Sequence, residues 1–246
     1  MKRLWSQITA SVLVNSIYQM KNYPVVLINT ALSPISFLVL IFLVSDGALL
    51  GESILGGLIM AMFQGGIALQ SDLSHLKNDF KLQDIVVSSP TNSRVYVAGM
   101  ALSEIVYSSP ALIILSILFV LTIHVSFLQI IGIVLILLMV FLSSVALSFA
   151  LSTISTDIVQ SHSFSRLITI LFTSLAPVYY PVSLIPEALQ PLAYLSPTTY
   201  AAQIAQHLAG LTQVSSEMFI FDWLVLLTFT TIFLWVGFRK ARWRDI

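Results

Sequence analysis

Long runs of apolar residues alternate with short polar segments along the chain. A helix that crosses a lipid bilayer needs roughly 20 predominantly apolar residues. Six stretches of the sequence approach that length, so the pattern predicts six transmembrane helices. They are expected near residues 23–44, 53–70, 98–123, 127–152, 164–180 and 220–238.

The composition supports a lipid environment. Of 246 residues, 57% are hydrophobic and only 9% are charged, and the mean hydropathy is +0.95. A soluble domain typically carries about 25% charged residues. Because so few polar residues could not cover a water-soluble fold of this size, we expect one all-α integral membrane domain over residues 1–246. The chain has no cysteine, which excludes disulfides and thiolate metal sites.

The charges are segregated although the formal net charge is zero. With the N-terminus placed in the cytoplasm, all 11 basic residues fall in cytoplasmic segments, as the positive-inside rule requires. This predicts a multi-pass protein of the plasma membrane with both termini cytoplasmic. The basic residues are Lys2, Arg3, Lys21, Lys77, Lys81, Arg94, Arg166, Arg239, Lys240, Arg242 and Arg244. The outer segments carry only acids, namely Asp46, Glu52, Glu187, Glu217 and Asp222.

The first 22 residues form a separate amphipathic segment. Leu4, Trp5, Ile8 and Val12 recur at helical spacing with polar residues between them. This pattern predicts a helix that lies in the interface of the inner leaflet.

A longer cytoplasmic connection covers residues 71–97. Three apolar residues there share one helical face and two lysines lie one turn apart on another, which predicts a short amphipathic helix that docks on another protein. A solvated loop is the alternative. The predicted docking residues are Leu73, Leu76, Lys77, Phe80 and Lys81.

The outer connection, residues 181–216, is apolar but contains four prolines within 17 residues, at positions 181, 186, 191 and 197. Proline lacks the amide hydrogen and clashes with the preceding turn, so it interrupts a helix. Both properties predict broken half-helices that re-enter the outer leaflet under the cover of other protein.

Few residues inside the predicted spans could carry chemistry. Glu104 is the one carboxylate well inside a span, and it is either a ligand on a translocation path or a structural residue bonded to Tyr107 or to a neighbouring hydroxyl. Gln64 is the second candidate for such a path, and the glycine pairs on either side of it favour close helix packing. Pro110 and Pro177 are expected to kink their helices.

No nucleotide-binding or catalytic pattern occurs. The chain contains neither a Gly-x-x-x-x-Gly-Lys-Ser/Thr stretch nor a His-Glu-x-x-His pair, and its four histidines are scattered. We therefore expect no enzyme activity, no bound cofactor and no metal in this chain.

The run from Tyr179 to Tyr200 reads YYPVSLIPEALQPLAYLSPTTY. It resembles the signature of type-2 ABC exporter permeases, the family that includes daunorubicin-type drug exporters and polysaccharide and lipid exporters. Ser196 stands where the family frequently has asparagine. A second run, residues 82–99, resembles the segment that leads into the third helix of these permeases. The residues assigned to the outer motif are Tyr180, Pro181, Pro186, Glu187, Pro197 and Tyr200.

The resemblance implies a permease that exports an amphiphilic, drug-like, lipid or glycan substrate. ATP and magnesium would be bound by two partner ATPase subunits, and the cytoplasmic residues 73–84 would be the nearest candidate for the family's coupling helix. A second permease copy or a related permease, and membrane lipid, are the other expected partners, with no nucleic acid. Two rival hypotheses remain: an ion-coupled secondary transporter or channel, and a non-transporting membrane anchor or immunity protein.

Overall fold

The structure, a computed structural model, describes residues 2–78, 93–152, 155, 157–174 and 176–240. Every regular element in that part is helical, which confirms the predicted all-α class. The elements are α1 (Lys2–Val12), the π-helical η1 (Leu13–Ile17), α2 (Tyr18–Asn22), α3 (Val25–Val44), α4 (Leu50–Asn78), α6 (Ser93–Tyr107), α7 (Ser109–Thr122), α8 (Phe127–Ser152), α9 (Ile158–Ser174), the 3-10 turn η2 (Val182–Leu184), α10 (Gln190–Ala193), α11 (Pro197–Leu208) and α12 (Ser216–Lys240).

Among the described residues, four helices are long and apolar enough to cross a membrane, namely α3, α4, α8 and α12. The number of candidate spans rises to five if the bent pair α6–α7 is counted as one span. The fifth predicted span, residues 164–180, corresponds to α9, which has 17 residues and carries Arg166. The chain is thus built as a multi-pass membrane protein, and the count of six stays a prediction.

Pro110 breaks the third predicted span into α6 and α7. It is the second residue of α7, and the two helices meet at an angle of 57°. Without an amide hydrogen, Pro110 cannot donate to the carbonyl of the preceding turn, so the helix bends there. The predicted kink is confirmed.

The prediction for the fifth span is wrong at both ends. Residues 164–180 were expected to be helical, but α9 begins at Ile158 and ends at Ser174. The residue before a proline disfavours the helical conformation, and Ala176 precedes Pro177. Pro177 therefore lies beyond the helix and does not kink it.

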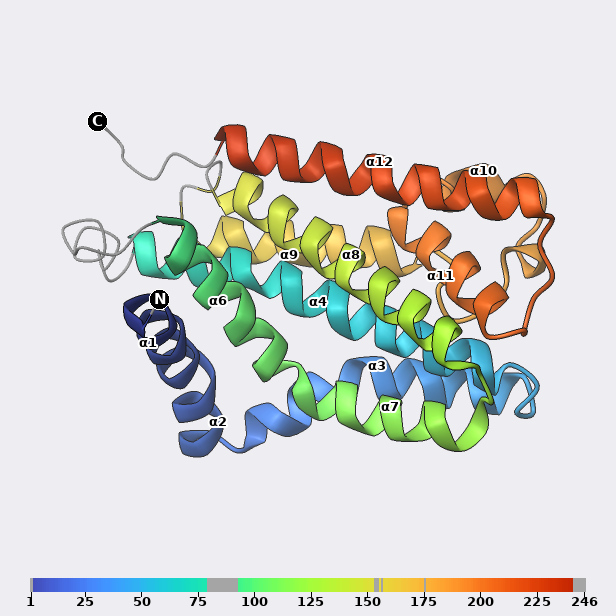
Figure 1. The fold of residues 1–246 in the computed structure, drawn as a ribbon, viewed down its shortest axis with the longest axis horizontal. Coiled ribbons are helices and arrows are strands. Elements are labelled where there is room, and N and C mark those ends of the chain that lie inside the picture. The colour runs from blue at the N-terminus through green and yellow to red at the C-terminus, as the bar shows by residue number, and fades with distance from the viewer. Residues whose placement is uncertain (1, 79–92, 153–154, 156, 175, 241–246) are drawn as a thin grey trace.

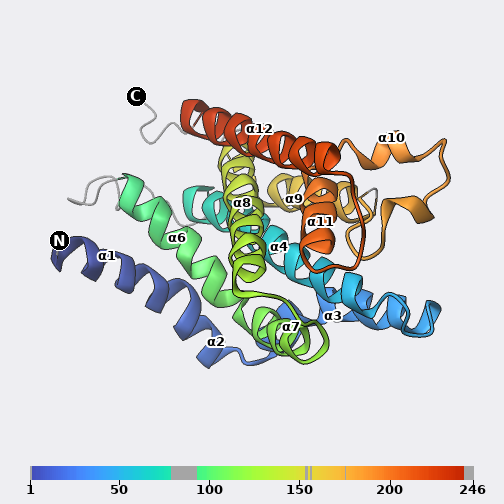
Figure 2. The same cartoon turned by 45° about the vertical axis from the view of Figure 1, so that its right-hand side comes forward.

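Helix α4 lies at the centre of the molecule, with α3, α7, α8, α9 and α11 packed around it (Figures 1 and 2). Within its candidate span, 89% of the residues are buried, against 17% for both α3 and α12. The main core is formed by side chains of α4 together with α7, α8, α11 and the segment before η2.

The N-terminal elements α1, η1 and α2 stand apart from this bundle, and α1 and η1 pack along α6 (Figure 1). Gly99 of α6 permits the close approach, because a Cβ there would lie 2.8 Å from Cβ of Ser11. Leu4, Trp5 and Val14 are exposed. A helix at residues 2–22 is therefore confirmed, and its position in the membrane interface stays a prediction.

Candidate functional site

The outer connection is broken into η2, α10 and α11, as its prolines predict. The motif residues divide into two groups. Pro197 and Tyr200 are buried, whereas Pro186 and Glu187 are exposed, and Tyr180 and Pro181 are partly buried. Helix α11 packs against α4, α8 and α12, so other helices shield this part of the broken segment, whereas Leu184, Leu189 and Leu195 before it are exposed. Its depth in a membrane stays a prediction.

The start of α11 is defined by local hydrogen bonds. Ser196 caps the helix, since its side chain accepts a hydrogen bond from the amide of Thr198. Pro197 follows at the first helical position, where the missing amide hydrogen has no cost. The Tyr200 hydroxyl donates to the carbonyl of Tyr194 over 2.9 Å, which ties α11 to the end of α10.

The segment that leads into η2 is anchored in a notch on α4. A Cβ on Gly56 would lie 2.5 Å from the Val178 carbonyl oxygen, so only glycine allows the two backbones to approach so closely. The Ser53 hydroxyl donates to the Tyr179 carbonyl over 3.3 Å. The ring of Phe37 on α3 stacks on Tyr179 with centroids 5.3 Å apart. Helices α3 and α4 together thus hold the start of the outer segment.

The other glycines of α4 face other helices. A Cβ on Gly57 would meet Leu115 of α7, one on Gly65 would meet Ser108, and one on Gly66 would meet Ser144 of α8. The predicted packing role of these glycines is confirmed.

Gln64, a candidate for the translocation path, lies between the glycine pairs and donates from Nε2 to the Ser33 hydroxyl of α3 over 3.3 Å. A cavity of about 430 Å³ along the α6–α7 bend is lined by neither Gln64 nor Glu104. Both residues stay candidates for the path.

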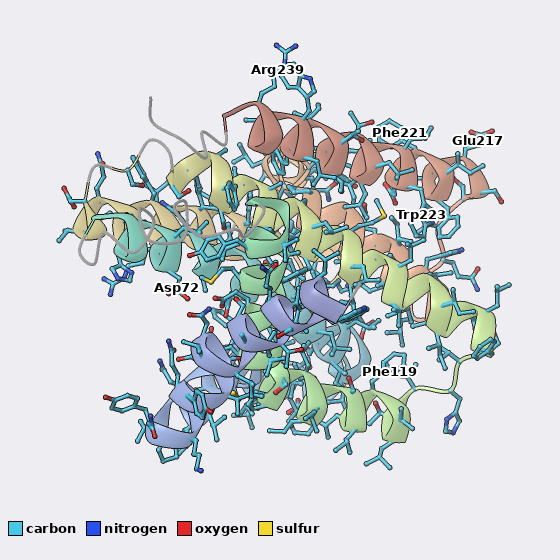
Figure 3. All side chains as sticks on the ribbon, turned by 60° about the vertical axis from the view of Figure 1, so that its left-hand side comes forward. Asp72, Phe119, Glu217, Phe221, Trp223 and Arg239 are labelled. Atoms are coloured by element: carbon cyan, nitrogen blue, oxygen red, sulfur yellow. The ribbon has the colours of Figure 1, made fainter. Side chains whose placement is uncertain are left out.

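Glu104 is buried in α6 and hydrogen-bonds to the side chain of Asp72 on α4. The predicted structural partner of Glu104 was Tyr107 or a neighbouring hydroxyl, whereas Asp72 was expected in the cytoplasmic connection. The missed signal is that Asp72 follows the predicted span by only two residues, so a slightly longer α4 carries it (Figure 3). On that helix Asp72 reaches Glu104.

The inner half of α4 is joined to α9 by a polar cluster around the buried Gln70. Its side-chain oxygen accepts from the Ser165 hydroxyl over 2.7 Å, and its Nε2 donates to the Ser155 hydroxyl over 3.2 Å. The Gln70 carbonyl also accepts from the Ser161 hydroxyl over 3.2 Å. Lipid tails are as apolar as the helix surfaces, so the hydrophobic effect does not bring helices together in a membrane. Hydrogen bonds between hydroxyl and amide groups of neighbouring helices then stabilise their packing.

The predicted docking residues begin on α4 and not on a separate helix, because α4 continues unbroken to Asn78. Leu73 is partly buried and packs against a cluster within the chain that includes Met100 and Phe141. Phe80 and Lys81 lie outside the described residues, as do the side chains of Leu76 and Lys77. Their role in docking an ATPase stays a prediction.

Asp222 departs from the expectation that it is an outer surface charge. It lies on α12 with an exposed fraction of 1%. Its place within an apolar run, between Phe221 and Trp223, was the available signal for burial. Among the residues that the structure describes, no group of three His, Asp or Glu side chains is arranged to hold a metal ion.

Comparison with known proteins identifies the family. A search of the curated proteins gave no match. The family model described as "ABC-2 type transporter" matches residues 6–209, which includes every described helix from α3 to α11. This match confirms the resemblance found in the outer motif. Permeases of this family work together with an ABC ATPase partner. The chain therefore belongs to the ABC-2 type transporter family and is the permease component of an ABC transporter.

Proposed function

We propose that this permease exports an amphiphilic, drug-like, lipid or glycan substrate from the cytoplasm, driven by ATP hydrolysis in two partner ATPase subunits. It works with a second permease copy or a related permease in the plasma membrane. The observation that carries the proposal is the family match over residues 6–209, in a chain that has no P-loop of its own.

The geometry of α4 supports a mechanism for coupling. The helix has 29 residues and no break, which corresponds to roughly 43 Å at 1.5 Å per residue. One end adjoins the predicted docking residues, and the other end holds the outer segment at Ser53 and Gly56. A push by an ATPase on the inner end of α4 would therefore be transmitted to the outer segment as a rigid movement.

The test uses the permease purified together with its ATPase and reconstituted in vesicles. We expect the ATPase to co-purify and the vesicles to take up an amphiphilic dye only when ATP is supplied. Truncation of a buried aromatic anchor at an interface costs on the order of 2 kcal/mol, about 30-fold in affinity. Phe80→Ala with Leu76→Ala should therefore release the ATPase and abolish uptake.

Lys77→Ala and Lys81→Ala are the matched controls in the same segment. Single exposed charges contribute roughly 1 kcal/mol or less and are screened by salt, so these variants should keep the ATPase. If the apolar double variant also keeps the ATPase at the wild-type level, the coupling surface lies elsewhere on the chain.

The orientation is tested separately, and the absence of native cysteine makes the test clean. An impermeant thiol reagent added to intact cells should label cysteines introduced at Asp46, His124 and Gln213. It should not label Lys77→Cys or Arg239→Cys. Labelling of Lys77→Cys from outside would contradict the proposed topology.

A further inference from the structure

Asp222 is a buried carboxylate without a hydrogen-bond donor. Neither of its oxygens accepts a hydrogen bond from any residue that the structure describes. Oε1 of Gln203, on the neighbouring helix α11, is likewise buried and without a partner in the described part of the chain. Isolated buried charges are costly, and buried polar atoms are almost always partnered. These three oxygens therefore lack a positive or hydrogen-bonding ligand.

Ring contacts fix how α11 and α12 face each other. His207, in the last turn of α11, lies against Phe219 near the start of α12, with ring centroids 4.8 Å apart. Tyr200, near the start of α11, lies 6.4 Å from Phe229. The two helices are therefore antiparallel, and these four rings mark the faces that meet.

Gln203 and Asp222 lie on these facing surfaces at the same level. Gln203 is three residues after Tyr200 and four before the last-turn histidine, so it shares their face of α11. Asp222 is three residues after Phe219 and shares the face of α12 that meets α11. The register thus places Asp222 opposite Gln203.

The donors closest in the register are neutral amides and hydroxyls, and part of their hydrogens is already used. Nε2 of Gln203 donates to the Tyr194 hydroxyl over 3.3 Å, and the Tyr200 hydroxyl donates to the Tyr194 carbonyl. Gln206, one turn further along α11, has an Nε2 without a partner among the described residues, but it is neutral.

No lysine or arginine of the helices packed at this place can neutralise the carboxylate, and the nearest basic group is His207, which lies against Phe219 about one turn away. Residues 127–152 and 197–238, which include α8, α11 and nearly all of α12, contain no lysine or arginine. Helix α4 also contacts α11, and its one basic residue, Lys77, is at the opposite end of that helix. The helices around Asp222 therefore supply no lysine or arginine as a permanent counter-charge, which leaves room for a cation from solution.

We propose that a monovalent alkali cation binds between α11 and α12, held by the carboxylate of Asp222 and the amide oxygen of Gln203. Oxygen ligands suit hard cations, and one carboxylate balances one positive charge. Because the two ligands come from different helices, the bound cation fastens the re-entrant helix α11 to α12.

The test uses the purified full-length permease in lipid nanodiscs without an ATPase. Binding of radioactive ²²Na⁺ is measured at equilibrium, and thermal unfolding is followed in NaCl and in N-methylglucamine chloride at equal ionic strength. We expect saturable ²²Na⁺ binding that excess KCl competes away, and a higher unfolding midpoint in NaCl. Asp222→Asn and Gln203→Met should lose both effects. Glu217→Gln, which removes an exposed carboxylate from the same helix, should keep both.

Several outcomes would overturn the proposal. One is a wild-type permease with no saturable ²²Na⁺ binding, and another is undiminished binding in Asp222→Asn. A third is that Asp222→Asn stabilises the permease equally in both salts, because an amide mimics a protonated carboxyl and a proton would then be the natural ligand. If Asp222→Asn does not fold, Gln203→Met decides, since it leaves every charge in place. These measurements need no ATPase, so their failure leaves the proposed export function untouched.

Discussion

Helices α3 and α4 follow each other in the chain and are both apolar enough to span a membrane, but their surroundings differ. The candidate span of α3 has a mean hydropathy of 2.3 and is 17% buried, whereas that of α4 has a mean hydropathy of 1.4 and is 89% buried. The less apolar helix is therefore the more buried one. In a membrane, the residues that face lipid must be apolar, while those that face other helices are small or polar.

Helix α12 resembles α3, with a mean hydropathy of 2.0 and the same buried fraction of 17%. Its inward face nevertheless carries Asp222, just as the inward faces of α4 carry Gln70 and Asp72. Hydropathy thus identifies which segments can cross a membrane. The glycines, hydroxyls and carboxyls within them identify the faces that meet protein.

The largest effect is expected at Gly56, where the backbone of another segment touches α4. Gly56→Val places a side chain 2.5 Å from the Val178 carbonyl oxygen and 2.8 Å from Cα of Tyr179, and neither backbone atom can rotate away. Overpacking of a core costs about 1–3 kcal/mol, and we expect the upper end or beyond. The measurement is the yield of monodisperse protein on gel filtration and its midpoint of thermal unfolding.

The control for Gly56→Val is Ala68→Leu, which enlarges an exposed residue on the same helix. It should leave the yield and the unfolding midpoint unchanged. If both variants are equally tolerated, the close contact between α4 and the outer segment does not form in the membrane.

The second effect concerns the polar cluster that joins α4 to α9. Gln70→Leu removes an acceptor of the Ser165 hydroxyl and a donor to the Ser155 hydroxyl, so we expect a loss of roughly 1–2 kcal/mol in the free energy of unfolding. Titration with SDS, followed by tryptophan fluorescence, measures this loss. Gln64→Leu, which removes one longer hydrogen bond on the same helix, should cost less. Equal costs would contradict the view that Gln70 organises the junction.

A smaller effect is expected where α8 meets α4. The buried Ser148 hydroxyl donates to the Gly66 carbonyl over 2.7 Å. Interhelical hydrogen bonds in membranes contribute about 0.6 kcal/mol on average, and Ser148→Ala should lower the free energy of unfolding by a similar amount. Ser152→Ala removes a hydroxyl that bonds only within α8, to the Phe149 carbonyl, and should have no measurable effect in the same SDS titration.

The sequence predicted those parts of the fold whose signals are local. The bounds of α8 agree with the predicted residues 127–152, because the Ser126 amide and hydroxyl both donate to Gln129 at its start. The bend at Pro110 follows from the chemistry of proline. The outer motif led to the family because its prolines occur at fixed intervals along the chain.

Features that depend on contacts between distant residues were not predictable from hydropathy. A charge ends an apolar run in the sequence, so Asp72 and Asp222 were assigned to the surface, but each lies on the face of its helix that meets other helices. The continuation of α4 to Asn78 depends on partners on α6 and α9 that lie tens of residues away. Such contacts determine which residues are buried. The hydropathy pattern of one helix does not show which distant residues that helix contacts.

The smallest effect is expected on the exposed face of α3. Leu40 has an exposed fraction of 53%, so lipid tails replace the contacts that Leu40→Ala removes. Substitutions at exposed positions usually change stability by less than about 0.5 kcal/mol, and we expect this one to fall within that range in SDS titration of the permease in lipid. Leu55→Ala, the same truncation at a position of α4 with an exposed fraction of 1%, should be clearly destabilising. If Leu40→Ala is equally destabilising, and more so at high protein concentration, the exposed face of α3 is covered by a second permease chain. The contrast between α3 and α4 would then describe the single chain and not the assembled transporter.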